Sequence, residues 1–164
     1  MRTPLNFLLF ILGVALSGST LADPPDNYPF LSYDEGMRQA QAQHKPIFIY
    51  FGRFGCGYCE KTNVESFSNP ALRERYIKNY VLVYIDAESG KRLRLPTGEP
   101  VTEAEMGARL NVFATPVFLY ADMNGKILFR APGFKTVEDF TAFDQYIQSG
   151  RYKSESINEF LSNK

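Results

Sequence analysis

The chain has 164 residues, which is enough for one domain with a sizeable core and too few for two ordinary ones. Its 18 Lys and Arg residues balance 18 Asp and Glu residues. Without a basic excess to displace counterions from phosphates, we expect no nucleic-acid partner. The 14 Phe and 10 Tyr residues predict an aromatic core and exclude a disordered or low-complexity chain.

Residues 1–22 have the order of a secretory signal peptide. Arg2 is followed by an apolar stretch over 5–16 and by small and polar residues over 17–22. We predict cleavage before Asp23 and a periplasmic location. An uncleaved anchor is the alternative, but an apolar stretch of about a dozen residues is shorter than the roughly 20 that span a bilayer as a helix.

The next segment, 23–31, contains three prolines and predicts an extended leader. A helix is expected from Ser32, because acidic residues occupy its first turn and basic residues its end, as the helix dipole favours. His44 lies at the end of this helix, where we interpret it as a C-terminal cap or a partner of the dipole. The main domain is predicted to span 32–150.

Residues 46–51, PIFIYF, predict a strand that is buried on both faces. A glycine-rich turn, GRFGCGYC, separates this strand from a helix expected over 59–67. Val64 and Phe67 are predicted to face inward from this helix. The two cysteines of the chain therefore lie at a junction between a strand and a helix.

Asn69 and Pro70 predict the cap and first position of a second helical piece, which ends near Lys78. Residues 80–86, YVLVYID, predict another buried strand. Two strands joined by a helix form a βαβ unit, so we expect a right-handed connection and parallel strands.

The polar segment 87–101 contains two Gly and two Pro residues and predicts an exposed loop. A capping-box pattern at Thr102 predicts a short helix to about Leu110. Two apolar runs, 116–120 and 127–131, follow with an Asn-Gly turn signal between them, which predicts a β-hairpin.

Apolar residues at helical spacing predict a final helix over 137–147, and a further short helix is expected in the tail, 151–164. The order of elements is helix, βαβ unit, helix, hairpin and helix. It predicts an α/β domain with a mixed four-stranded sheet covered by helices on both faces.

Cys56 and Cys59 are the only cysteines, and they are three positions apart at the start of a predicted helix. A zinc site is one alternative, but it needs two more ligands and the chain has a single His. A purely structural disulfide is another alternative, but a loop this short gains little stabilisation from a cross-link. We predict no metal ligand.

Placement at a helix N-terminus favours reactive cysteines. Unpaired backbone N–H groups and the helix dipole stabilise a thiolate there and lower its pKa from about 8.5 into the range ~3.5 to 7.5. Cys56 is therefore the predicted nucleophile, and Cys59, one turn further, is the predicted resolving thiol. Gly57 and Tyr58 between them are candidate substrate-binding residues, although Tyr58 can equally be a surface residue without a role.

Several motifs in order resemble the thioredoxin superfamily. They are the strand IFIYF, the motif GCGYC, Thr115-Pro116 before VFLY, and the hairpin and final helix with Gly133 between them. Together they cover 33–148. The segments around the motifs resemble two exported branches of the superfamily, which are the periplasmic C-terminal domain of the transmembrane reductant conductor and the thioredoxin-like proteins of sulfur-oxidation systems.

The resemblance implies a thioredoxin-like fold in which Pro116 is cis and lies beside the cysteines. It also implies that the backbone N–H and C=O of Thr115 pair with an extended segment of the substrate. A trans proline that opens an edge strand is the alternative.

The function implied is a periplasmic thiol-disulfide oxidoreductase that reduces disulfides in exported proteins through a Cys56/Cys59 cycle, without a cofactor. Expected partners are disulfide-containing exported proteins and a membrane reductant conductor, and a monomer is expected. The alternatives are a disulfide oxidase or isomerase of the same fold, and a non-catalytic metal- or peptide-binding module.

Two positions depart from the pattern that the resemblance implies. Gly55 stands directly before the first cysteine, where Trp is usual, and Phe54 is then the nearest aromatic residue. Tyr50 stands six positions before Cys56, where many members carry a buried acid that assists proton transfer at the second thiol. Proton handling at Cys59 must therefore use water, the Tyr50 hydroxyl or another group.

Overall fold

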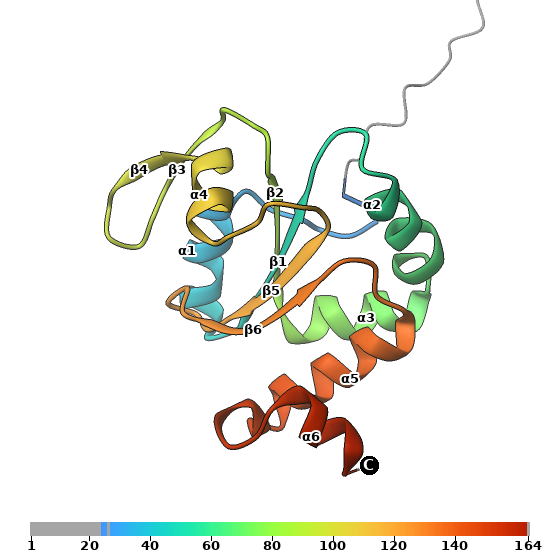
Figure 1. The fold of residues 1–164 in the computed structure, drawn as a ribbon. Helices are drawn as coiled ribbons and strands as arrows, with labels where there is room; N and C mark the ends of the chain where they lie inside the picture. The colour runs from blue at the N-terminus through green and yellow to red at the C-terminus, as the bar shows by residue number, and fades with distance from the viewer. Residues whose placement is uncertain (1–23, 26, 164) are drawn as a thin grey trace, which may run out of the picture.

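The computed structural model describes residues 24, 25 and 27–163 (Figure 1). The predicted signal peptide and its cleavage site lie outside the described residues, so the signal peptide and the periplasmic location stay predictions. Within the described part of the chain, no helix is both long enough and apolar enough to cross a membrane.

Four strands form the central sheet in the order β2-β1-β5-β6. β1 is parallel to β2 and antiparallel to β5, and β5 is antiparallel to β6. The predicted mixed four-stranded sheet is therefore confirmed, including the parallel pairing within the βαβ unit. The strands are β1 (Ile47–Gly52), β2 (Val81–Asp86), β5 (Val117–Ala121) and β6 (Ile127–Pro132).

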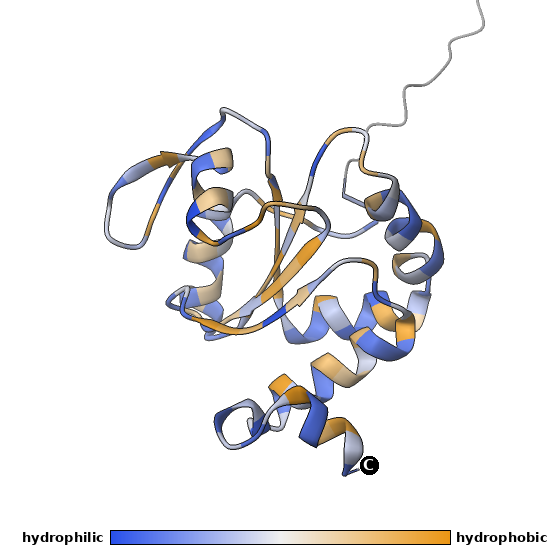
Figure 2. Cartoon of the chain, in the orientation of Figure 1, coloured by the Kyte–Doolittle hydropathy of each residue, from blue (hydrophilic) through white to orange (hydrophobic). Residues whose placement is uncertain are grey.

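Helices cover both faces of this sheet, as predicted (Figure 1). In Figure 2 the hydrophobic strands lie in the centre, and the helices around them carry hydrophilic residues. One face packs against α1 (Tyr33–Gln43) and α4 (Glu103–Arg109), and the other packs against α2 (Gly57–Thr62), α3 (Pro70–Asn79) and α5 (Val137–Gln148).

Strand β1 supplies both cores because its side chains alternate between the two faces. Phe48 and Tyr50 enter the aromatic core beneath α3 and α5, whereas Ile47, Ile49 and Phe51 enter the aliphatic core beneath α1 and α4. Every residue of β1 is buried. The prediction of a strand that is apolar on both faces is therefore confirmed.

Side-chain caps define the ends of several helices where the sequence predicts them. Thr102 accepts from the backbone N–H of Glu105 and completes the predicted capping box of α4. Asn69 accepts from the N–H of Leu72 at the start of α3. His44 follows α1 in the left-handed region, with φ of 54°, and is its C-cap through its backbone N–H, which donates to the carbonyl of Gln41, and not through its side chain. Further helices in the C-terminal region are the 3-10 turn η2 (Arg151–Lys153) and α6 (Ile157–Ser162).

The prediction that 87–101 is only an exposed loop is wrong. It contains β3 (Arg92–Arg94), which pairs with β4 (Pro100–Thr102) in a separate two-stranded antiparallel sheet. Leu93 and Val101 face each other in this pairing and are buried in the aliphatic core. One apolar residue in each short strand is enough to attach the hairpin.

The prediction that Val64 faces inward is also wrong, since its side chain is 65% exposed. The helix after the cysteines changes at Asn63 to a π-helical turn, η1 (Asn63–Phe67). A π turn contains more residues than an α turn, so the side chains that follow are rotated about the axis. Phe67 is buried as predicted, and Ser66 is the other inward residue.

The segment before α1 is extended and packs on the domain. The ring of Tyr28 contacts the ring of Phe67 edge-on, with centroids 5.2 Å apart. Leu31 forms a parallel bridge with β2, donating its N–H to the carbonyl of Leu82 and accepting from the N–H of Tyr84. This segment therefore covers the outer edge of β2 and part of the aromatic core.

We expect Phe48→Ala to lower the free energy of unfolding by about 3–5 kcal/mol, because it empties a fully buried site. The Phe48 ring is stacked on Phe118 and meets Tyr76 edge-on with centroids 4.9 Å apart. Urea unfolding would measure the change. Phe54→Ala is the matched control and should cost less than about 0.5 kcal/mol, because Phe54 is exposed. An equal decrease in the free energy of unfolding for the two variants would contradict the burial of Phe48 in the core.

Candidate active site around the cysteine pair

The cysteines lie where the chain leaves β1 and enters α2. Gly55 turns the chain with a φ of +67°, a conformation that favours glycine. Cys56 is the N-cap of α2, and Cys59 lies in its first turn. The predicted order of strand, turn and helix is therefore confirmed, and it places both sulfurs at the N-terminus of α2.

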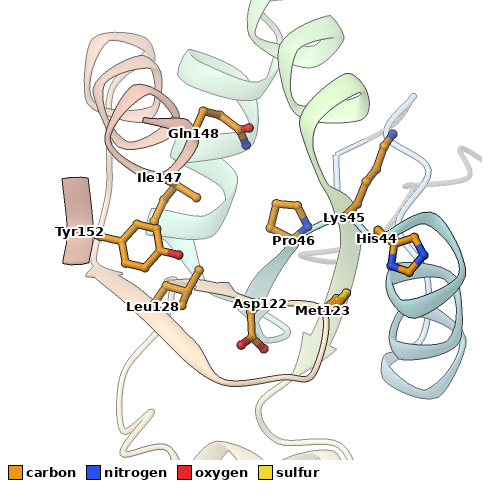
Figure 3. Close-up of a pocket in the computed structure, with 9 residues that line it drawn as sticks. All are labelled: His44, Lys45, Pro46, Asp122, Met123, Leu128, Ile147, Gln148 and Tyr152. Atoms are coloured by element: carbon orange, nitrogen blue, oxygen red, sulfur yellow. The ribbon is translucent and has the colours of Figure 1, made fainter. Parts of the chain in front are cut away.

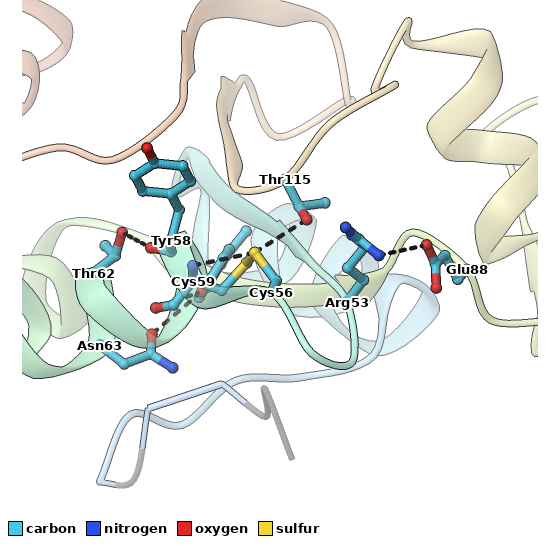
Figure 4. Close-up of a disulfide and its surroundings, with 9 residues drawn as sticks. Arg53, Cys56, Tyr58, Cys59, Thr62, Asn63, Glu88 and Thr115 are labelled. Atoms are coloured by element: carbon cyan, nitrogen blue, oxygen red, sulfur yellow. Dashed lines mark hydrogen bonds and ion pairs between the residues drawn. A yellow bond between two sulfur atoms is a disulfide. The ribbon is translucent and has the colours of Figure 1, made fainter. Parts of the chain in front are cut away.

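Cys56 and Cys59 form a disulfide in this structure, with an S–S distance of 2.12 Å (Figure 4). Cys56 is 5% exposed and Cys59 is 0% exposed, so the residue expected to be the nucleophile is the more accessible of the two. The backbone N–H of Cys59 donates to the Cys56 Sγ at 3.1 Å. The Thr115 hydroxyl donates to the same sulfur at 3.2 Å. Two donors therefore converge on Cys56.

Thr115 and Pro116 reach the cysteines because β1 and β5 are antiparallel, with Phe51 opposite Val117. The Thr115–Pro116 peptide bond is cis. Among the described residues, no main-chain hydrogen bond is made by the N–H groups of 113–115 or by the C=O groups of 112–115. The backbone beside the cysteines is thus open to an external partner.

Gly57 and Tyr58 continue the first turn of α2 on the exposed side. Tyr58 is 65% exposed, and its backbone carbonyl accepts from the hydroxyl of Thr62 at 2.8 Å. Its ring points away from the disulfide (Figure 4). The structure therefore brings Cys56, Cys59 and Thr115 into direct contact, while the Tyr58 ring lies at the edge of the site.

The Tyr50 hydroxyl lies beneath Cys59, at the position where this chain departs from the buried acid of the pattern that the resemblance implies. It donates to the Oδ1 of Asn63 at 3.3 Å and lies 3.5 Å from the carbonyl oxygen of Cys59. Desolvation by burial raises the pKa of Tyr50 far above its ordinary value, so the hydroxyl remains protonated. Asn63 was not predicted as a site residue, because only the π-helical turn and β1 together bring it to Tyr50.

The surface around the disulfide carries exposed aromatic rings and paired charges. Phe54 is 62% exposed and Phe113 is 82% exposed. Arg53 and Glu88 form an ion pair with an N–O distance of 3.0 Å. Phe113 was missed from the sequence because an aromatic residue in a predicted loop gives no sign of its exposure.

The zinc alternative finds no support from the described residues, which contain no group of three or more His, Cys, Asp and Glu side chains able to hold a metal ion.

A cavity of about 250 Å³ lies beside the opposite end of β1 and includes His44 and Asp122 in its lining (Figure 3). The Asp122 carboxylate already accepts from the backbone N–H groups of Asn124 and Lys126. Neither cysteine lines this cavity, so it is not part of the candidate site.

Comparison with known proteins identifies the family to which this geometry corresponds. A family model described as a thioredoxin-like domain matches residues 33–148. An uncharacterised protein of Archaeoglobus fulgidus is 31% identical over 109 residues, which cover 66% of this chain and 86% of that protein.

Two solved structures share the fold. A thioredoxin-fold protein from Helicobacter pylori has a TM-score of 0.61 at 23% identity, with 74% of this chain and 80% of that chain covered. The oxidised C-terminal domain of Neisseria meningitidis DsbD has a TM-score of 0.50 at 14% identity, with 70% and 90% covered.

In the reduced protein we expect iodoacetamide to label Cys56 with a half-maximal rate below pH 8.5, the ordinary cysteine value, and to label Cys59 hardly at all. Thr115→Val should move the Cys56 profile to higher pH by about one unit. The hydroxyl stabilises the charged form, and a hydrogen bond to a charged group is worth about 1.5 kcal/mol, close to the 1.36 kcal/mol of one pKa unit.

Thr115→Ser keeps the hydroxyl and is the matched control, so its profile should follow that of the unsubstituted protein. Mass spectrometry of the labelled peptides separates the two cysteines. Equal labelling of both thiols with an ordinary titration would contradict the assignment of Cys56 as the nucleophile.

Proposed function

Because the chain belongs to the family of thioredoxin-like domains, we propose that it is a thiol-disulfide oxidoreductase that reduces disulfides in exported proteins through Cys56 and Cys59. The observation that carries the proposal is the convergence of two hydrogen-bond donors on the sulfur of Cys56, the more accessible of the two cysteines. Donors that meet a sulfur at the N-terminus of a helix stabilise the thiolate, and the thiolate is the nucleophile in disulfide exchange.

In the first step, the Cys56 thiolate of the reduced protein attacks one sulfur of the substrate disulfide. A bond forms between Cys56 and that sulfur, the substrate S–S bond breaks, and the other substrate sulfur leaves as a thiolate that takes up a proton. The open main chain of 113–115 supports this step, because an extended substrate segment can pair with it beside Cys56.

In the second step, Cys59 loses its proton and attacks the Cys56 sulfur of the mixed disulfide. The Cys56–Cys59 bond forms, and the remaining substrate sulfur leaves as a thiolate that takes up the second proton; one of the two protons comes from Cys59 and the other from the solvent, which received the Cys56 proton. The substrate has then gained two electrons and two protons, and the protein is in the disulfide form that this structure shows. An external dithiol must reduce it for the next cycle, and a membrane reductant conductor is the proposed donor.

The location and the direction of the reaction are parts of this proposal. The order of basic, apolar and small residues over 1–22 supports export to the periplasm. The same two cysteines can oxidise or reduce, since the direction depends on the reduction potential. A disulfide oxidase or isomerase is therefore the second candidate. A copper-binding role is less well supported, because no His follows Cys59 and the single His, His44, lines the cavity at the opposite end of β1.

We expect Cys59→Ala to accumulate mixed disulfides between Cys56 and exported proteins, because the second step is blocked while the first proceeds. Alkylation of periplasmic extracts, non-reducing gel separation and mass spectrometry would identify the attached proteins. Cys56→Ala is the control and should trap nothing. A non-catalytic binding module would be indicated if the Cys59→Ala protein carried no disulfide-linked partner.

The reduction potential decides between the leading function and its alternative. We expect a value near −270 mV, as in a thioredoxin, measured by equilibration with glutathione or dithiothreitol buffers. A value near −120 mV is typical of a strong oxidant and would replace the proposed reductase with an oxidase.

A further inference from the structure

A cavity of about 390 Å³ opens beside the reactive cysteine. Thr115 is part of its lining, and the Thr115 hydroxyl donates to the Cys56 sulfur. The rest of the lining comes from Arg53 after β1, from 87–88 after β2 and from 112–114. The cavity and the sulfur therefore share one wall, and a molecule bound at the sulfur can enter the cavity as well.

The most exposed large apolar side chain at this cavity is Phe113, at 82%. Among the described residues its ring takes part in no aromatic pair, although most of the buried Phe and Tyr rings do so. The Phe113 ring therefore contributes little to the packing of the core. A ring held at the mouth of a cavity offers a face on which an apolar or aromatic side chain can pack.

The charges at the rim cancel locally. Arg53 and Glu88 both line the cavity and pair with each other at 3.0 Å. A cationic or anionic side chain entering the cavity would meet one like charge or would have to displace one member of the pair. The rim therefore favours a neutral side chain, and the pair still offers hydrogen bonds to a hydroxyl group.

The open main chain of 113–115 orients the molecule that can enter. An extended segment paired with it has side chains that alternate between two sides, so residues two positions apart point the same way. They are separated by about 6.6 Å, given a rise of about 3.3 Å per residue. When the substrate cysteine points to Cys56, the residue two positions away points along the same surface toward the cavity.

We propose that this cavity is a specificity subsite that receives a neutral aromatic side chain, two positions from the cysteine, of an extended substrate polypeptide. Phe113 provides the packing surface, and the Arg53–Glu88 pair excludes charged side chains. This inference rests on the proposed function and adds the class of substrate segment that the same site selects.

The test uses reduced protein and short peptides that carry one cysteine linked by a disulfide to 2-mercaptoethanol. Tyr, Lys, Glu or Ala is placed two positions before or after the cysteine. Oxidation of the protein is followed after acid quench, alkylation and mass spectrometry. Bis(2-hydroxyethyl) disulfide is the reference, because it reports on the cysteine pair without occupying the subsite, and each rate is divided by the reference rate of the same variant.

At one of the two positions, Tyr should react about 10-fold faster than Ala, the upper end of what packing of one aromatic ring on Phe113 can supply, and Lys and Glu should react no faster than Ala. Phe113→Ala should reduce this Tyr preference to less than about twofold. Phe54→Ala is the matched control, since it removes another exposed ring that does not line the cavity, and it should keep the preference. Both rings are exposed, so neither truncation empties the core.

A second pair of variants tests the charge argument. Glu88→Gln leaves Arg53 without its partner at the rim. The peptide with Glu at the selected position should therefore react with this variant at a higher normalised rate than with the unsubstituted protein. Glu65→Gln removes the same charge from an exposed position outside the cavity lining and should not change the order of the peptides.

Equal normalised rates for all peptides, or a Tyr preference that survives Phe113→Ala, would overturn the subsite while leaving the proposed function intact. Failure to react even with bis(2-hydroxyethyl) disulfide would instead reject the redox function, and the subsite with it.

Discussion

The antiparallel pairing of β1 with β5 is the constraint on which the site depends. Its register sets Phe51 opposite Val117, so the loop that follows β1 lies beside the loop that precedes β5. Cys56 and Thr115 are 59 positions apart in the chain, and this pairing brings the Thr115 hydroxyl to 3.2 Å from the Cys56 sulfur. The parallel pairing with β2 brings the segment after Asp86 to the same end of the sheet, where it forms another wall of the cavity.

Rigid packing beneath this edge keeps the loops in place. Phe67, at the end of the π-helical turn, contacts Phe118 of β5 and Phe140 of α5. The ring of Tyr28 rests on the same side chain. Interiors packed in this way resist small displacements, so the helix that carries the cysteines is held against the strand that leads from Thr115. The segment before α1 thus contributes to the support of the site.

Hydrophobic periodicity was enough to predict the four-stranded sheet, the helices on both faces and the position of the cysteines at a helix N-terminus. It failed where structure depends on contacts that no local pattern encodes. The β3–β4 hairpin attaches through one buried residue per strand, Leu93 and Val101, among polar neighbours. The π-helical turn that exposes Val64 consists of residue types that also occur in α-helices, so its sequence does not distinguish it from an α-helical turn. The pairing of Tyr50 with Asn63 joins a strand to that turn, so it required the tertiary structure.

The surroundings of the two sulfurs differ in a way that bears on the order of the chemical steps. Cys56 receives two donors at a helix N-terminus, which favours its thiolate. Both cysteines belong to the aromatic core, but Cys59 is completely buried, and the hydroxyl beside its backbone belongs to Tyr50, which burial keeps protonated and uncharged. A thiol in apolar surroundings gives up its proton reluctantly. Because a protonated Tyr50 cannot act as a base, the proposed reaction requires the proton of Cys59 to leave to water or to the substrate thiolate released in the first step. In the proposed reaction, attack by Cys56 is therefore the easier step, and release of the substrate depends on access of that proton acceptor to Cys59.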